Sequence, residues 1–563
     1  MRTCSIMLLG VTCLAAGQIP DGDSRNVTIP NTDTHFSMPV FKSRAEWEQR
    51  AARLRRQVLF AAGLLPMPRK HPLNPQIFGR IERKGYSVEK VLLETMPGYY
   101  LGGNLYRPLG REGKFPAVLS PHGHWNYGRL ENSAAASIPG RCINLARLGF
   151  VVFSYDMVGY DDTIQTPHAF GGPREQLWSF GPLGLQLWNS IRAVDFLESL
   201  PEVDATRIGA TGASGGGTQT FLLTAADDRV SFSAPVNMIS AIMQGGSPCE
   251  NAPLLRIGTN NMEIAALMAP RRMLMVSATG DWTRNTPREE FPAIQAIYRL
   301  FDKESNVQTI QIDAPHNYNQ ASREAVYRFF TGRDTAEEPF TPEKPQDLLA
   351  LHNRTLPSNA LTYPQIVEQW IEAARAQNDP DRELLRLALA ADWPSKVLSE
   401  RAGDQIVLSR EGAGDRVSGV WHEGRTPAAI LVDAESSEPD RATLRLTVFQ
   451  TGSAVAPRDR SHPHFLTFNK TDDAERVQDI LTALAWLHQP DVQLKCAGKA
   501  AIWCTFAAAV APVRVRLDAP APDFHGTDQE FIDNFFVPGI QRAGGWKAAL
   551  NLSHRTERGG NIF

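Results

Sequence analysis

The stretch Arg207-Ile-Gly-Ala-Thr-Gly-Ala-Ser-Gly-Gly-Gly-Thr218 decides the fold. It begins as a short apolar strand, passes through Gly212-Ala213-Ser214-Gly215-Gly216, and continues into an expected helix over 218–226. A serine between glycines at a tight strand-to-helix turn is the pattern of a nucleophile elbow, because glycines there permit a strained backbone and close packing. The N-terminus of the helix also stabilises negative charge that develops beside the hydroxyl. We therefore predict that Ser214 is a nucleophile and not part of a plain glycine turn.

Strand-like apolar runs alternate with helical stretches on both sides of this turn. Continuous apolar strands between helices predict an α/β fold whose mostly parallel sheet is covered on both faces. The expected strands lie at 117–120, 149–155, 207–211, 272–277 and 307–312, and the clearest helices at 185–200 and 218–226.

A serine hydroxyl needs a base that is oriented by an acid, and in this kind of fold the chain order is serine, acid, histidine. Asp281 follows the strand at 273–277, and His316 follows the strand at 307–312. Ends of neighbouring parallel strands converge on one edge of the sheet, so both side chains should reach Ser214. Asp313 is the competing acid, but it shares a loop with His316 and is only three residues away, so Asp281 is the better candidate.

The negatively charged oxygen of an acyl-transfer intermediate needs two backbone donors. We predict that these are the N–H groups of Gly215 and of His124, which lies in the loop Pro121-His-Gly-His-Trp125. The pair His122-x-His124 could instead bind a metal, but no third ligand accompanies it at a convincing spacing. The sequence therefore implies no metal and no organic cofactor.

Other residues near the expected site have weaker assignments. Trp125 and Trp282 are candidates for stacking on a sugar ring, and packing is an equally good interpretation. Asp156 follows a strand and is expected to hold neighbouring loops by hydrogen bonds. No role is assigned to Cys249-Glu250-Asn251.

Composition and charge exclude several classes of protein. The 563 residues are 42% hydrophobic and 21% charged, with a net charge of -3, which is typical of a globular protein and gives no sign of nucleic-acid or membrane-surface binding. The length favours at least two domains. We expect an N-terminal helix and β-meander over 18–110, a catalytic domain over 111–332, a proline-rich linker over 333–360, and a second α/β half over 361–563 that weakly echoes the first.

The N-terminus predicts export to the periplasm or the medium. Residues 1–17 combine Arg2, an apolar run and the small residues Ala15-Ala16-Gly17, as in a cleaved signal peptide. No membrane association is expected after cleavage. An exported protein could pair some of its four remaining cysteines, but buried free thiols are the favoured interpretation; they are Cys142, Cys249, Cys496 and Cys504.

These motifs resemble the α/β-hydrolase superfamily, and within it the acetylxylan esterase and cephalosporin-deacetylase type of carbohydrate esterase. The resemblance covers about residues 80–330 and rests on the elbow, on His122-Gly123, and on the stretches that precede the elbow and the acid strand, Val203-Asp-x-x-Arg-Ile-Gly209 and Ala269-Pro-Arg271. It implies a Ser214, Asp281, His316 triad and hydrolysis of a carbohydrate acetyl ester through an acyl-enzyme. The elbow lacks the family's Ser-Gln-Gly form, and Asn317 follows His316 in place of glutamate.

The second half resembles a degenerate hydrolase, because aligning Gly212 with Gly498 places Ala500 at the position of Ser214. For the whole chain we expect a small-molecule or glycan ester as substrate. Two alternatives remain open: a serine peptidase of the prolyl-oligopeptidase type, and a non-catalytic binding or scaffold homologue.

Overall fold

The computed structural model describes residues 19–553 except 378, 437, 521 and 522, so the predicted signal peptide lies outside the described residues. The described chain forms two compact units. One contains 30–377 and 462–469, and the other contains 19–29, 379–461 and 470–553. Within these residues, no helix has the length and apolar character needed to cross a membrane.

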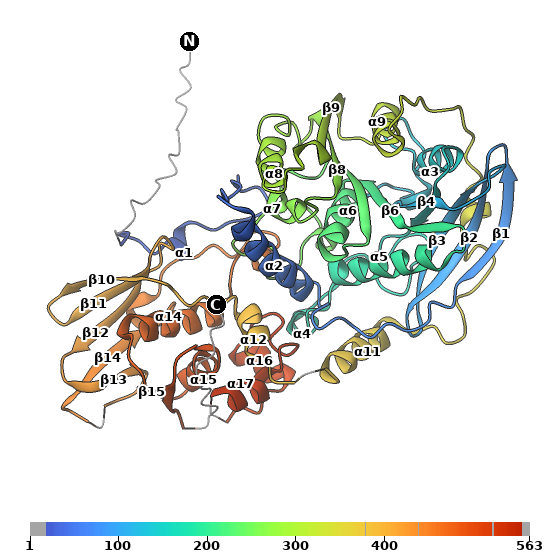
Figure 1. Ribbon diagram of the computed structural model, residues 1–563. Helices are drawn as coiled ribbons and strands as arrows, with labels where there is room; N and C mark the ends of the chain where they lie inside the picture. Colours follow the sequence, from blue (N-terminus) through green and yellow to red (C-terminus); the bar gives the residue numbers. More distant parts are fainter. Residues whose placement is uncertain (1–18, 378, 437, 521–522, 554–563) are drawn as a thin grey trace, which may run out of the picture. The chain divides into compact units, whose positions relative to one another are not determined.

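The first unit is built on a nine-stranded sheet with the order β1-β2-β3-β5-β4-β6-β7-β8-β9 (Figure 1). The first three strands form an antiparallel meander that joins β5 in antiparallel pairing, and all pairings from β5 to β9 are parallel. The strands are β1 (Gln76–Arg83), β2 (Tyr86–Met96), β3 (Tyr99–Pro108), β4 (Phe115–Leu119), β5 (Val151–Tyr155), β6 (Val203–Ala213), β7 (Val230–Val236), β8 (Arg272–Gly280) and β9 (Val307–Pro315).

Helices cover both faces of this sheet. Helices α3 and α9 share one face, and α5, α6, α7 and α8 follow one another on the other (Figure 1). Side-chain caps fix where several of them begin: Ser43 caps α2, and Asn319 caps α9. The main helices of the unit are α2 (Arg44–Ala61), α3 (Ile138–Arg147), α5 (Pro182–Ser199), α6 (Gly215–Ala226), α7 (Asn261–Ala266), α8 (Glu290–Arg299), α9 (Gln320–Thr331) and α11 (Tyr363–Arg375).

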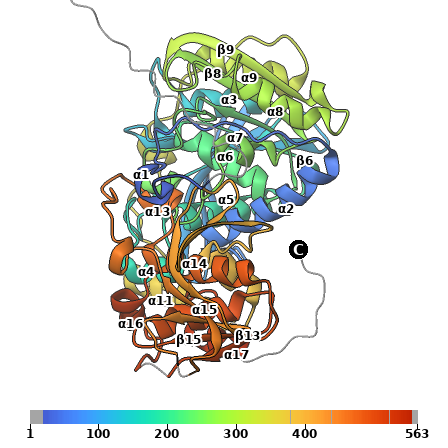
Figure 2. The same cartoon turned by 90° about the vertical axis from the view of Figure 1, so that its left-hand side faces the viewer.

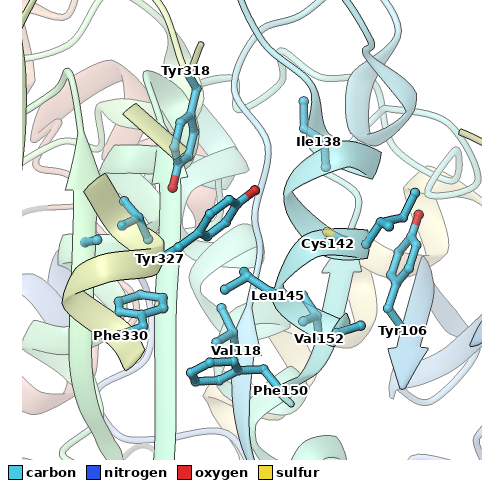
Figure 3. Packing of buried hydrophobic residues seen from close by; sticks show 14 of the residues in the cluster. Tyr106, Val118, Ile138, Cys142, Leu145, Phe150, Val152, Tyr318, Tyr327 and Phe330 are labelled. Carbon is cyan, nitrogen blue, oxygen red and sulfur yellow. The ribbon is translucent and has the colours of Figure 1, made fainter. Parts of the chain in front are cut away.

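A buried cluster between the sheet and helices α3 and α9 supports the strand ends that precede Ser214 and His316 (Figure 3). Tyr318 and Tyr327 lie on one side of it, and Cys142 and Leu145 come from α3 on the other. The Tyr318 hydroxyl lies 2.6 Å from Thr211 Oγ1, which joins the loop after β9 to the elbow strand. Burying each large apolar side chain contributes about 1.5–3 kcal/mol, so this core holds the strand ends in place.

The expected linker over 333–360 is instead part of the first unit, and the boundary between the units lies at 378/379. Glu337 forms a buried ion pair with Arg323 at 2.6 Å. Further on, the carboxylate of Asp162 accepts the N–H groups of Ala350 and Leu351, both at 2.8 Å. The proline-rich composition suggested a linker without fixed contacts, but buried contacts of this kind fix the segment on the first unit.

The second unit repeats the strand order of the first seven strands. Its sheet runs β10-β11-β12-β14-β13-β15-β16, with an antiparallel meander followed by parallel pairings. Helices α14 and α15 pack on it (Figure 2). The strands are β10 (Val397–Ala402), β11 (Gln405–Arg410), β12 (Val417–His422), β13 (Arg425–Val432), β14 (Arg441–Thr447), β15 (Val492–Cys496) and β16 (Val515–Asp518), and the main helices are α12 (Arg382–Leu389), α14 (Asp472–Leu487), α15 (Ala500–Val510), α16 (Asp528–Asn534) and α17 (Gly545–Ser553).

A disulfide in the second unit corrects one expectation. Cys496 at the end of β15 is bonded to Cys504 in α15, whereas Cys142 and Cys249 are free and buried, as favoured for all four. The strand-to-helix turn between Cys496 and Cys504 brings the two residues together. That proximity depends on the turn, which spacing alone did not reveal.

Candidate active site

Ser214 stands at the turn between β6 and α6 in a strained backbone conformation, with φ 59° and ψ -127°. For a residue other than glycine such a conformation is costly, and it is maintained when the surroundings over-determine it. A Cβ atom at Gly212 would lie 2.6 Å from the Pro121 carbonyl oxygen, and one at Gly216 would lie 2.7 Å from it. Both positions therefore require glycine, and the sharp turn that the sequence predicted is present.

The predicted acid and base are in direct contact. His316, after β9, donates from Nδ1 to Asp281 Oδ2 at 2.8 Å, and Asp281 lies directly after β8. The other oxygen of this buried carboxylate accepts the Thr283 N–H at 2.7 Å and the Thr283 hydroxyl at 2.6 Å. Asp313 is exposed and accepts from Thr279 instead, so the structure pairs His316 with Asp281.

His316 Nε2 faces no protein partner. It is buried and makes no hydrogen bond to any described residue, Ser214 included. Since Nδ1 carries the proton that Asp281 accepts, Nε2 holds a lone pair that can accept a proton. Hydrogen bonds to a catalytic base are often long in unliganded structures and shorten when substrate binds.

The two predicted tryptophans both lie close to the His316 ring. The ring centroid of Trp125 is 6.2 Å away in a stacked arrangement, and that of Trp282 is 4.4 Å away. A Cβ atom at Gly123 would lie 3.0 Å from Ser214 Cβ and 3.3 Å from Trp125 Nε1. The serine and the imidazole therefore share Trp125 as a neighbour, and stacking of either tryptophan on a sugar stays a prediction.

The two predicted oxyanion donors are the backbone N–H groups of Gly215 and His124. Gly215 is the first residue of α6, and the N–H groups of a first helical turn have no acceptor within the helix. The His124 N–H makes no backbone hydrogen bond in the described part of the chain. A Cβ atom at Gly215 would lie 2.7 Å from Cε1 of His124, so the two predicted oxyanion donors belong to adjoining residues.

Two buried polar residues, His122 and Arg141, hold the loop at 121–125. The sequence analysis considered His122 only as a metal ligand and as part of the family resemblance, and it did not name Arg141. His122 donates from Nδ1 to the Gly123 carbonyl at 2.7 Å and accepts the Met157 N–H on Nε2 at 2.9 Å. Burial lowers the pKa of His122 to about 3, so the ring is neutral. Arg141 of α3 donates to Ser120 Oγ at 2.8 Å at the start of the loop. The sequence signal for this support is Arg141, a charged residue in a helix that also carries Asn144 and Arg147.

Asp156 has the structural role that the sequence analysis expected. It is buried against the guanidinium of Arg129, which also donates to Asp162 at 2.5 Å and to Asn104 at 2.8 Å. The backbone N–H of Asp162 donates to Asp156 at 2.9 Å. Because Asp162 also accepts the N–H groups of Ala350 and Leu351, this network connects the loop after β5 to that segment.

The strained serine after β6, the aspartate after β8 and the histidine after β9, in that chain order, define an α/β-hydrolase, and the chain belongs to that superfamily. Within it, the chain is similar to the solved structure of methylesterase BT1017, with 31% sequence identity, a TM-score of 0.51, and coverage of 60% of this chain and 78% of that one. The predicted fold and the predicted resemblance to esterases of this superfamily are thus confirmed.

Other comparisons are more distant. YtaP of Bacillus subtilis (strain 168), described provisionally as a hydrolase, is 27% identical over 262 residues, which is 43% of this chain and 84% of that protein. A glucuronoyl esterase from Solibacter usitatus is 16% identical with a TM-score of 0.40, covering 54% of this chain and 98% of that one. No protein-family model matches the chain.

Proposed function

We propose that this protein is a serine ester hydrolase that acts on a carbohydrate ester through an acyl-enzyme. The observation that carries the proposal is the His316–Asp281 pair, whose Nε2 has no hydrogen-bond partner among the described residues, together with a serine in the strained conformation of an elbow. Similarity to a methylesterase over 78% of that protein supports ester hydrolysis as the reaction.

In the proposed reaction His316 Nε2 takes the proton of the Ser214 hydroxyl while Oγ attacks the ester carbon. Asp281 holds the tautomer that leaves Nε2 unprotonated and then stabilises the charged imidazole. The N–H groups of Gly215 and His124 bind the oxyanion. His316 returns the proton to the departing alcohol. Water then attacks the acyl-enzyme while His316 Nε2 takes a proton from it, and His316 passes this proton to Ser214 Oγ as the acid is released.

Two ester types are candidates, and they differ in which side carries the sugar. In a carbohydrate acetyl ester, which the sequence motifs suggest, Ser214 takes a small acetyl group and the sugar leaves as the alcohol. In a methyl ester of a sugar acid, favoured by the likeness to a methylesterase, methanol leaves and the sugar acid remains on Ser214. The products, acetate or methanol, therefore distinguish the two.

The test is to incubate the protein with acetylated glycans and with methyl-esterified acidic glycans, and to measure acetate and methanol. Ser214→Ala should lower turnover about a millionfold, the scale seen when a triad nucleophile is removed. Ser199→Ala, at the end of α5, is the matched control and should keep parental activity. Parental activity in Ser214→Ala would refute the assignment.

The open alternatives have their own outcomes in the same experiment. Cleavage of aminoacyl amides in preference to both ester types would indicate the peptidase. Absence of Ser214 labelling by a fluorophosphonate would indicate the non-catalytic homologue, because the reagent reacts only with an activated serine.

We also propose that the protein is exported. The signal-peptide pattern at 1–17 and the Cys496–Cys504 disulfide support this, since disulfides persist in oxidising compartments. Cell fractionation of a tagged full-length chain tests it: the mature protein should appear outside the cytoplasm without residues 1–17.

A further inference from the structure

Three side chains from distant parts of the sequence meet beside the predicted oxyanion loop. Nε2 of His124 lies 3.2 Å from Nε2 of His168 and 3.1 Å from Sγ of Cys249. The hydroxyl of Ser247 lies 3.1 Å from the same nitrogen and 3.2 Å from the same sulfur. The proposed esterase chemistry uses none of these side-chain atoms.

Hydrogen bonding among these residues cannot satisfy all the contacts. A ring nitrogen carries either one proton or one lone pair, so His124 Nε2 can form only one of its three short contacts as a good hydrogen bond. Nδ1 of His168 lies 2.7 Å from the Val158 carbonyl oxygen, which only accepts. Nδ1 is therefore protonated in the neutral ring, and the lone pair of His168 Nε2 is directed at His124.

A backbone carbonyl that orients a histidine in this way is the usual outer partner of a metal-binding imidazole. We propose that His124, His168 and Cys249 form a site for Zn²⁺, with Ser247 Oγ or a water molecule in the fourth position. Two imidazoles and a thiolate are a donor set that zinc prefers, and three protein ligands leave one position open.

The spacing of the donor atoms fits this ion. In a tetrahedral zinc site, bonds of about 2.0 Å to nitrogen and 2.3 Å to sulfur place two nitrogens ~3.3 Å apart and a nitrogen and a sulfur ~3.5 Å apart. The distances from His124 Nε2 are 3.2 Å to nitrogen and 3.1 Å to sulfur, so small side-chain rotations suffice. All three donor atoms lie within 4.8 Å of one another.

Zinc binding releases one proton, from Cys249, and transfers no electrons. A zinc–sulfur bond forms as the Cys249 S–H bond breaks, and the proton passes to solvent, while both imidazoles bind as neutral lone-pair donors. The thiol is buried but both imidazoles are partly exposed, so the ion can enter from the histidine side. Bound zinc would connect the loop at 121–125 with the segments that carry His168 and Cys249.

The neighbouring group of His122, Asp156 and Asp161 shows what a saturated cluster looks like. Both nitrogens of His122 already have backbone partners. Asp156 and Asp161 face the buried Arg129 guanidinium, which supplies the positive charge that a cation would bring. That group is explained without a metal, whereas the crowded His124 nitrogen is not.

The test measures metal on the full-length protein without substrate, so it is independent of the proposed esterase function. After exposure to Zn²⁺ and dialysis, elemental analysis should give one zinc per chain. Cobalt should bind in place of zinc and produce a thiolate-to-cobalt charge-transfer band. Cys249→Ser should abolish the band and lower retained zinc at least tenfold, and His168→Gln should likewise lower retained zinc.

Cys142→Ser is the matched control, because Cys142 is also a free buried thiol but contacts Ser120 instead of histidines. It should bind zinc as the parent does. Circular dichroism checks that each variant folds, and His168→Gln decides the question if Cys249→Ser does not fold. A parent protein that retains no zinc, or variants that retain one zinc per chain, would overturn the proposal.

Discussion

Replacing Asp281 with asparagine tests the proposed triad at the point where its geometry is best defined. Oδ1 of Asp281 accepts two hydrogen bonds from Thr283, at 2.7 Å from the N–H and at 2.6 Å from the hydroxyl. In Asp281→Asn the side-chain oxygen should keep these two donors. The amide nitrogen would then face His316 Nδ1, where the carboxylate oxygen now lies at 2.8 Å.

That arrangement reverses the tautomer of the imidazole. An amide N–H facing Nδ1 requires Nδ1 to accept, so the proton moves to Nε2, which must be free to take the serine proton. The same substitution in a serine protease triad lowers kcat about 10⁴-fold with the geometry intact, which corresponds to about 5 kcal/mol in the barrier. We expect a loss of this size here, with little change in KM.

The assay is steady-state hydrolysis of an acetyl ester by purified, folded variants, with Asp313→Asn as the control. Asp313 lies three residues from His316 but is exposed and bonded to Thr279, so its replacement should leave kcat within about twofold. A loss below tenfold in Asp281→Asn would refute the reasoning, as would an equal loss in both variants, because the tautomer argument applies to Asp281 alone.

Three further predictions concern the surroundings of the site. His122 is neutral in the folded state because burial lowers its pKa to about 3, so its contribution to stability is complete above pH 6.5 and is lost as the pH falls toward 3. Between pH 6.5 and 5 the free energy of unfolding measured in urea should fall by about 2 kcal/mol more in the parent than in His122→Gln. Equal falls in the two proteins would contradict this. Gly123→Ala places a Cβ atom 3.0 Å from Ser214 Cβ and should lower kcat about a hundredfold. The control Gly181→Ala, whose Cβ atom meets nothing within 4 Å, should leave kcat unchanged. Equal rates for the two variants would argue against close packing at the elbow. Thr211→Val leaves the buried Tyr318 hydroxyl without its partner at 2.6 Å and should lower the free energy of unfolding, measured thermally, by about 1–3 kcal/mol. The same substitution should cost less in a Tyr318→Phe protein. An equal cost in that background would show that another contact of Thr211 is responsible.

Local patterns were sufficient to predict the parts of the site that depend on local structure. The glycines around Ser214 permit the turn by their own backbone freedom, so the elbow could be located from sequence alone. Asp281 and His316 were predicted because each directly follows an apolar run, and parallel strands bring such ends to one edge. Asp313 was set aside on loop geometry alone, and the structure pairs His316 with Asp281.

The missed features depend on contacts between residues far apart in sequence. His168 and Cys249 reach His124 only through the folded chain, so the spacing of ligands in the sequence pointed to His122 and His124 and not to these two residues. Segment 462–469 illustrates the same limit on a larger scale. It belongs to the hydrolase unit, where the carbonyls of Leu466 and Thr467 accept backbone N–H groups at 2.8 Å. The sequence analysis instead placed it in the second half, predicted over 361–563.

The second unit repeats the first seven strands of the hydrolase sheet, and in the first unit neither the acid nor the histidine follows any of these strands. Its seven strands follow the order of β1 to β7, but the acid and the histidine of the first unit follow β8 and β9, which have no counterpart in the described second sheet. The residue that caps α15, as Ser214 caps α6, is Lys499, one position before the Ala500 that the alignment suggested. In an α/β sheet, the catalytic residues follow the carboxyl ends of different strands. Without the last two strands, a serine restored at 499 would still have no acid–base pair, so Lys499→Ser should leave a Ser214→Ala protein inactive, and activity regained in that double variant would contradict this account of the repeat.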